Sequence, residues 1–174
     1  MSTFSVLSFI YSLVNAILSG TAQGLQPLWG LCYGEQDADG MNLYFRWGIR
    51  INAILSVVIY GLLFLFAEPV IQIFNRDPEL VQNASAALSL FGLSFIPMAL
   101  NLIYTAFLYS TKRTLQADAI SLSRGVVLKA AAIFCMPVLF GIDVIWLAPF
   151  AAELLTLVLA LVLSRDCKLA ECRD

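Results

Sequence analysis

The first apolar stretch of the chain contains a run of small and polar residues, Gly20-Thr21-Ala22-Gln23-Gly24-Leu25-Gln26-Pro27-Leu28. The surrounding segment, 4–30, is otherwise apolar and long enough to cross a bilayer as a helix, which takes about 20 residues. Gly20 and Gly24 form a GxxxG pair, which lets a neighbouring helix approach closely. Pro27 is expected to kink the helix or to end its regular part. The run therefore predicts a membrane helix that packs against others.

Four further apolar stretches follow, at 43–66, 81–109, 119–139 and 144–163. Hydrophobic residues make up 60% of the 174 residues and charged residues 13%, against about 45–50% and about 25% in soluble domains. This composition predicts an all-α, polytopic membrane protein of five antiparallel transmembrane helices. We expect a single membrane domain over 1–174, with the third span bent at Pro97 and a short tail at 164–174.

Basic residues fall mainly on one side of these predicted spans. Arg76 lies on the other side and Lys129 within a span; the remaining eight are Arg46, Arg50, Lys112, Arg113, Arg124, Arg165, Lys168 and Arg173. Cytoplasmic loops carry such an excess. We therefore expect a multi-pass protein of the cell membrane, with the C-terminus cytoplasmic and the N-terminus of this chain outside. Because that arrangement is unusual for a chain with three residues before its first span, it indicates that a segment upstream is missing.

Several functional classes are excluded or disfavoured by residue content. The chain has no histidine, so it cannot carry a histidine proton relay or a Cys–His dyad. Its scattered cysteines (Cys32, Cys135, Cys167 and Cys172) show neither metal-ligand nor disulfide spacing. A net charge of −2 without basic clusters argues against a nucleic-acid partner. We expect no enzyme activity, metal or cofactor.

The loops contain local signals. Asp77-Pro78-Glu79 combines an N-cap residue, a proline at the first helical position and an acidic first turn, which predicts a helix start. The run 35–40 reads as a polar loop, and 110–118 as another. Arg46 and Arg50 are spaced i,i+4 near the cytoplasmic end of a span, where anchoring to lipid head groups is favoured over a role with substrate.

Two ionisable residues lie deep in predicted spans. Lys129 is ten residues from the cytoplasmic start of the fourth span and Glu153 nine from the outer start of the fifth, so each is about 13–15 Å deep at 1.5 Å per residue. In a core about 30 Å thick these depths coincide, which predicts a Lys129–Glu153 ion pair. The pair either neutralises itself within the helix bundle or contributes to an ion or substrate pathway.

Uncharged polar residues within the spans allow similar alternatives; they are Asn15, Gln23, Gln26, Asn52, Asn101, Tyr60 and Tyr104. Hydrogen bonding between helices accounts for most of them without a ligand. Broken helices with polar groups at mid-membrane also suit a transporter cavity or a channel. Composition leaves these readings open.

In its motifs the chain resembles the multidrug and toxic compound extrusion (MATE) family. The run 20–28 followed by Tyr33-Gly34 is the most specific match; weaker matches follow in order, at 66–71 with Phe74 and Asp77, Phe95-Ile96-Pro97, Ser123-Arg124, 141–148 and Glu153-Leu154. A complete member resembles two six-helix lobes around a central cavity, and this chain matches spans 8–12 of 12. The resemblance implies export of organic, often cationic, drugs in exchange for Na⁺ or H⁺.

The resemblance also implies partners and site residues. As partners we expect the bilayer, a small organic substrate, and either the missing seven N-terminal spans or a second copy, so that the chain alone is inactive. Pathway candidates are Glu153, Lys129, Asn101, Tyr104, Gln23 and Gln26, and the structural motif residues are Gly20, Gly24, Pro27 and Pro97. Where some members have an ion-binding carboxylate in the lobe's fourth helix, this chain has Pro97, Met98, Asn101 and Tyr104. An inactive or scaffold-like remnant and a related flippase for lipid-linked sugars are the alternatives.

Overall fold

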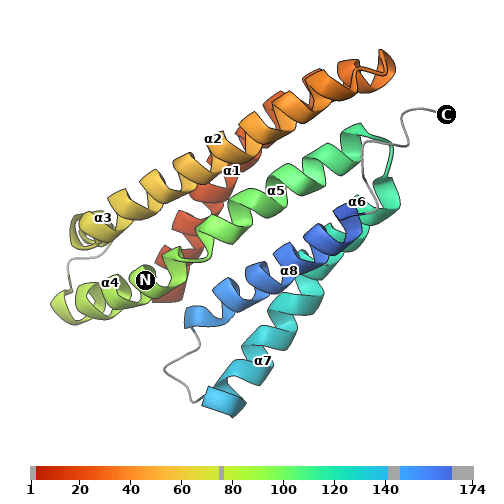
Figure 1. Cartoon of the computed structure of the whole chain (residues 1–174). Coiled ribbons are helices and arrows are strands. Elements are labelled where there is room, and N and C mark those ends of the chain that lie inside the picture. The colour runs from red at the N-terminus through yellow and green to blue at the C-terminus, as the bar shows by residue number, and fades with distance from the viewer. Residues whose placement is uncertain (1–2, 75–76, 141–145, 166–174) are drawn as a thin grey trace.

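A computed structural model describes residues 3–74, 77–140 and 146–165. Its helices are α1 (Thr3–Gly34), α2 (Ala38–Leu65), α3 (Ala67–Gln72), α4 (Pro78–Gly92), α5 (Phe95–Ser110), α6 (Thr114–Leu122), the π-helical η1 (Ser123–Val127), α7 (Leu128–Phe140) and α8 (Ala148–Arg165). The predicted all-α class is confirmed. Helix α5 lies at the centre, in contact with α1 and α2 on one side and with α8 on the other, and α8 packs in turn on α7 (Figure 1).

Length and apolarity support part of the predicted span count. Within the described residues, 4–34 and 38–65 are each long and apolar enough to cross a membrane, and α4 with α5 forms a third span if the bent pair is counted as one. The fifth predicted span corresponds to a shorter apolar helix, α8. The fourth corresponds to α6, η1 and α7, which follow one another without a gap. The count of five therefore stays a prediction.

Capping residues fix where two helices begin. The Asp77 carboxylate accepts a hydrogen bond from the Glu79 amide at 3.2 Å, so the predicted helix start there is confirmed. The Asp37 carboxylate accepts from the Gly40 amide at 2.9 Å, so α2 already begins at Ala38. The predicted loop at 35–40 is therefore too long, as is the one at 110–118. Each connection narrows to a tight turn with one residue at positive φ, Gln36 at 57° and Lys112 at 59°.

The prolines act differently at the two predicted bends. Helices α4 and α5 meet at 42°, at a break over Leu93 and Ser94. Pro97 lacks the amide that would bond to the Leu93 carbonyl four residues earlier, and its ring crowds that carbonyl. The predicted bend therefore occurs at the turn before Pro97, where the missing hydrogen bond and the crowded carbonyl lie. Pro27, in contrast, lies inside α1, which continues to Gly34, so it does not end the helix.

Helix approach occurs at glycines other than the GxxxG pair. A Cβ at Gly20 or Gly24 would meet nothing within 4 Å, so no described helix packs closely against either residue. A Cβ at Gly48 would lie 2.8 Å from the Leu25 side chain, and one at Gly92 would lie 2.8 Å from the Tyr60 ring. Close packing of α2 on α1 and on α4 therefore depends on Gly48 and Gly92.

A buried asparagine joins three helices. Asn52 of α2 is fully buried, and its amide donates to the backbone carbonyls of Leu18 (3.3 Å) and Ala99 (3.2 Å). Its side-chain oxygen accepts from the Thr21 hydroxyl. The prediction that such residues bond between helices is confirmed at this position. Asn52 of α2 thereby links α1, α2 and α5 through hydrogen bonds.

Candidate functional site

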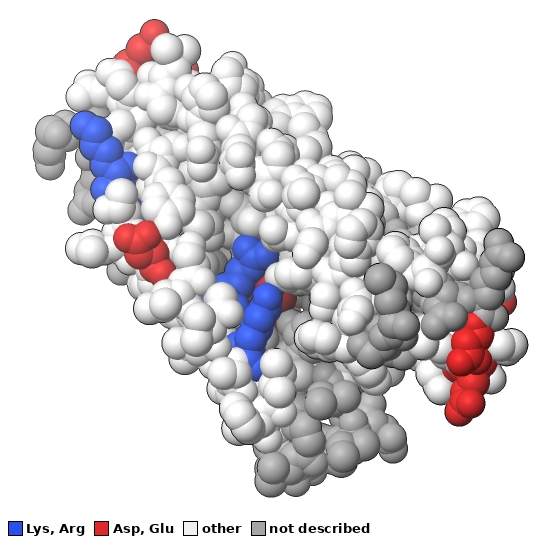
Figure 2. All heavy atoms as spheres, turned by 180° about the vertical axis from the view of Figure 1, so that it is seen from behind, with Lys and Arg blue, Asp and Glu red and all other residues white. Residues whose placement is uncertain are grey.

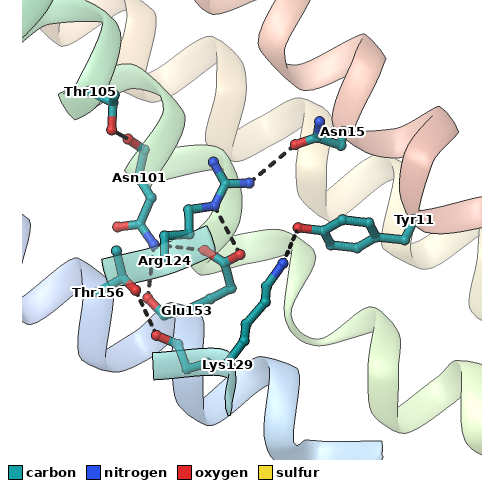
Figure 3. A network of polar contacts seen from close by, with 9 residues as sticks. Tyr11, Asn15, Asn101, Thr105, Arg124, Lys129, Glu153 and Thr156 are labelled. Carbon is teal, nitrogen blue, oxygen red and sulfur yellow. Dashed lines mark hydrogen bonds and ion pairs between the residues drawn. The ribbon is translucent and has the colours of Figure 1, made fainter. Parts of the chain in front are cut away.

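A buried carboxylate lies at the centre of a polar network between α5, α8, η1 and α1. Glu153 of α8 is fully buried. One of its carboxylate oxygens accepts from Arg124 Nε at 3.0 Å, and the other accepts from Asn101 Nδ2 at 2.9 Å (Figure 3). Asn101 also donates to the Glu153 backbone carbonyl at 2.9 Å. Two elements distant in sequence thus hold this carboxylate in place.

Arg124 connects the network to α1. Its guanidinium donates through a terminal nitrogen to Asn15 Oδ1 at 3.1 Å, in addition to its ion pair with Glu153. The Arg124 side chain is 15% exposed and that of Glu153 is 0% exposed. Because a charge in a membrane is costly unless paired, this ion pair satisfies both residues where either alone would be strongly unfavourable.

Lys129 binds a neutral partner instead of the predicted carboxylate. Its ammonium donates to the Tyr11 hydroxyl at 2.8 Å and lies 4.6 Å from the centre of the Tyr11 ring. The predicted Lys129–Glu153 pair is therefore wrong in its partner. The reason is the helix boundary: the helix begins at Thr114, five residues before the predicted start of the span at 119. Arg124, rather than Lys129, is then ten residues from that start.

The π-helical turn η1 brings Arg124 and Lys129 to one side. In an α-helix, five residues correspond to a rotation of about 140° beyond a full turn, which would place the two cations on different faces. A π-helix repeats its hydrogen bonds at i→i+5, so residues five apart are close to alignment. Figure 3 shows both side chains directed toward α1, where Asn15 and Tyr11 receive them.

The network has an excess of positive charge and an unsatisfied oxygen. Arg124 and Lys129 face one carboxylate, Glu153, which leaves a net charge of one positive. Among the described residues, Asn101 Oδ1 is buried and has no hydrogen-bond partner. The described part of the chain holds no group of three or more His, Cys, Asp or Glu that could bind a metal ion. Exchange of partners at the Glu153 carboxylate is the chemistry that this arrangement allows.

The other sequence-predicted candidates lie apart from this network. Tyr104, one turn beyond Asn101 on α5, packs edge-on against Phe45, with ring centres 5.3 Å apart. Gln23 is exposed and Gln26 half-buried on α1, and the network includes neither. Of the six candidates, the structure therefore brings Glu153, Asn101 and Lys129 together.

Sequence reasoning missed Arg124 and Tyr11 as members of this site. Arg124 was counted with the cytoplasmic residues of its span, although an arginine followed by an apolar stretch is itself a signal of a buried partner. Tyr11 gives no such signal, because a tyrosine in an apolar helix is common at membrane interfaces and in cores. The network also includes Asn15, one of the uncharged polar residues within the predicted spans.

Comparison with known proteins points to one family. The family model described as MatE matches residues 1–135. An outward-facing multidrug resistance MATE family transporter of the MOP superfamily superposes with a TM-score of 0.89 and 14% identity, over 98% of this chain and 39% of its own. An inward-facing transporter with the same description gives 0.88 and 14%, over 98% and 40%. Comparison with curated proteins gave no match. The chain thus spans about two fifths of the length of these solved transporters.

Proposed function

The chain belongs to the MatE family, and we propose that it forms part of a membrane transporter that exports small organic molecules in exchange for Na⁺ or H⁺. The observation that carries this proposal is the agreement in fold over nearly the whole chain, with a TM-score of 0.89. The burial of the ion-paired Glu153 is compatible with transport.

The proposed mechanism is alternating access with this chain moving largely as one body. The chain fits an outward-facing and an inward-facing transporter almost equally, with TM-scores of 0.89 and 0.88. Equal agreement with two states supports an internal arrangement that changes little between them. Rocking of one rigid unit against another around a central site is a common transport mechanism.

In this mechanism the Glu153 network lies on the transport pathway. Glu153, Arg124 and Asn101 come from three elements and meet inside the helix bundle. An ion pair there can open when a cation or substrate takes the place of one partner, whereas lipid-facing polar groups would serve no purpose. Lys129 is a second basic group on this pathway in our proposal. Tyr104, Gln23 and Gln26 stay candidates for residues that line the pathway.

The working unit contains more polypeptide than this chain in our proposal. The matched transporters are about two and a half times as long, and the second unit against which this chain rocks is either the rest of a longer polypeptide or a second copy. The chain itself acts as a single membrane domain. From the distribution of Lys and Arg we place the turns at 35–37 and 111–113 in the cytoplasm.

Dye export in cells tests this proposal. We would express the chain alone, and also a chimera in which it replaces the matching part of a solved MATE transporter, in cells that lack their own exporters. We expect the chimera to export ethidium or fluorescein, the chain alone to export neither, and export to slow when the Na⁺ or proton gradient is dissipated. A folded chimera that exports no dye would contradict the function, and export by the chain alone would contradict the larger working unit.

The pathway assignment is tested in the same chimera. Glu153→Gln removes the charge and keeps the shape, so export should fall by at least tenfold while the protein remains in the membrane. Glu68→Gln is the matched control, because Glu68 is exposed on the short helix α3, outside the network. Full export by Glu153→Gln would remove Glu153 from the pathway.

A further inference from the structure

The Glu153 network has one cation more than it has anions. Arg124 has Glu153 as its partner, whereas the partner of Lys129 in the described part of the chain is the neutral hydroxyl of Tyr11. A lysine in the middle of a span is costly when no charge compensates it. The position of Lys129 therefore favours any ligand that supplies a negative charge.

Lys129 lies beside an apolar pocket. The pocket has a volume of about 230 Å³ and is lined by Phe4, Leu7, Ser8, Phe91, Ile133, Trp146 and Pro149. Ile133 is four residues from Lys129 on α7, and Ser8 is three residues from Tyr11 on α1. These are the spacings of residues on one helix face. Both elements of the Lys129–Tyr11 contact thus continue into the wall of the pocket.

An aromatic contact completes the connection. The Tyr11 ring packs edge-on against Phe91, with centres 5.9 Å apart, and Phe91 lines the pocket. The cavity is lined by six apolar side chains and Ser8, and the Lys129–Tyr11 contact adjoins this lining through Phe91. Figure 2 shows basic atoms in a hollow of this otherwise mostly uncharged face of the molecule. A ligand that fits must have an apolar body and an anionic end.

Depth separates a soluble ligand from a lipid head group. Lys129 lies 15 residues from the start of α6 and 11 from the end of α7, about 22 Å and about 16 Å at 1.5 Å per residue. Lipid phosphates lie at the edge of the hydrocarbon core, about 15 Å from its centre. The ammonium group therefore lies near mid-membrane, where an organic anion in a cavity can reach it and a bilayer phosphate cannot.

We propose that the pocket and the Lys129–Tyr11 contact together bind an organic carboxylate with a compact aromatic or aliphatic body. The body occupies the apolar pocket and the carboxylate accepts a hydrogen bond from the Lys129 ammonium. As a statement about the exported substrate, this rests on the proposed transport function. As a statement about binding, it stands on the structure alone and is tested separately.

Equilibrium dialysis of the purified chain in phosphatidylcholine nanodiscs provides the test. The probes are 2-naphthoate and 2-naphthylmethylammonium, which share an apolar body and differ in charge. We expect binding of the anion to be at least tenfold tighter than that of the cation. Lys129→Met should weaken naphthoate binding at least tenfold, and Lys129→Arg should preserve it within about threefold. Ile133→Trp, at a half-exposed position, should weaken binding by filling the pocket.

The matched control is Lys112→Met. Lys112 also lies over a tyrosine ring, that of Tyr33 at 5.9 Å, but in a turn at the end of the helices, so its loss should leave naphthoate binding unchanged. Equal binding of the two probes, or full binding by Lys129→Met, would overturn the proposal. Loss of naphthoate binding in nanodiscs with 30% phosphatidylglycerol would assign the site to a lipid head group instead and would also overturn it.

The two proposals fail separately. Lys129-dependent naphthoate binding without dye export by the chimera would leave this inference standing and remove the transport function. Export of ethidium by the chimera, without preference for naphthoate in the dialysis experiment, would support the transport function and overturn this inference.

Discussion

Glu153 shows why a single buried charge constrains its neighbours. Its carboxylate is inaccessible to solvent, and its stability in the ionised form depends on the Arg124 guanidinium at 3.0 Å and the Asn101 amide at 2.9 Å. Breaking a buried ion pair by removing one partner is strongly unfavourable, because the other charge is left without compensation. Replacing both partners by apolar residues removes that penalty. The pair is thus more important for the arrangement of the helices than for net stability.

Arg124→Leu should therefore destabilise the fold far more than the double substitution Arg124→Leu with Glu153→Leu. We expect a loss of about 3–5 kcal/mol in the unfolding free energy for the single variant and recovery of most of it in the double variant. Unfolding of the purified protein in mixed micelles, followed by circular dichroism, measures both. Equal stability of the single and double variants would show that the ion pair does not hold Glu153.

At the residue scale, the sequence predicted which polar residues are buried better than it predicted the partner of each one. The need of Glu153 for a partner and the interhelical bonding of Asn52 followed from burial cost alone, and both appear in the structure. The partner of Glu153 did not follow, because depth was counted from residue 119 and an error of five residues exchanges Lys129 for Arg124. A shift of five residues moves a side chain along the helix by more than the length of a hydrogen bond, so it changes the partner. The same shift is a small fraction of the length of the helix.

At the scale of elements, the π-helical turn η1 determines which side chains reach the site. A π-turn contains one residue more than an α-helical turn, so residues on its two sides share a face at a spacing one residue longer than in an α-helix. Gly125 lies in this turn, is exposed, and has open space around the position of a Cβ. Sequence periodicity cannot locate such an insertion, since it assumes 3.6 residues per turn throughout.

Deletion of Gly125 should be tolerated. Removing one residue from η1 restores α-helical hydrogen bonding while keeping the faces before and after it, so the melting temperature should stay within a few degrees of the parent. Deletion of Ala131, in the regular helix α7, should lower it markedly because every later residue rotates by about 100°. Thermal unfolding followed by circular dichroism compares the two, and equal damage from both deletions would show that η1 is not an insertion.

Helix boundaries were predictable where a capping residue marked them. Where only the apolar pattern marked them, the observed boundaries differ from the predicted ones. The start of α4 followed from Asp77 and Pro78, and the break before α5 followed from Pro97. The start of α2 was placed late because Asp37 was read as part of a loop instead of as an N-cap. The polar turn before α6 likewise proved shorter than its composition indicated. Polar residues at the ends of membrane helices lie in head groups, so polarity does not end a helix there.

At the scale of the molecule, apolar surface on the outside of the bundle matches a lipid environment. Large exposed apolar side chains occur along α1, α2, α7 and α8, among them Leu13, Ile54, Val58, Phe134 and Val158. Patches of this extent are rare on soluble proteins. The turns at 35–37 and 111–113 lie at one end, since Lys112 reaches the Tyr33 ring, while α4 begins at the other. The arrangement predicts which loops share a side of the membrane.

Cysteine labelling tests this topology. After replacement of the native cysteines by serine, Gln36→Cys and Lys112→Cys should react with a membrane-impermeant maleimide from the same side, and Glu79→Cys from the opposite side. In right-side-out vesicles we expect labelling of Glu79→Cys alone, because our proposal places the basic end in the cytoplasm. Reaction of all three from one side would contradict the arrangement of the spans.

The separation of 29 positions between Arg124 and Glu153 also sets an order of events during synthesis. A ribosome adds about 5–20 residues per second, so the helix with Arg124 and Lys129 exists for about 1.5–6 s before its compensating carboxylate is made. A basic helix is poorly retained by hydrocarbon on its own. The last helix supplies the carboxylate that pairs with Arg124, so we expect the final third of the chain to enter the bilayer as a hairpin.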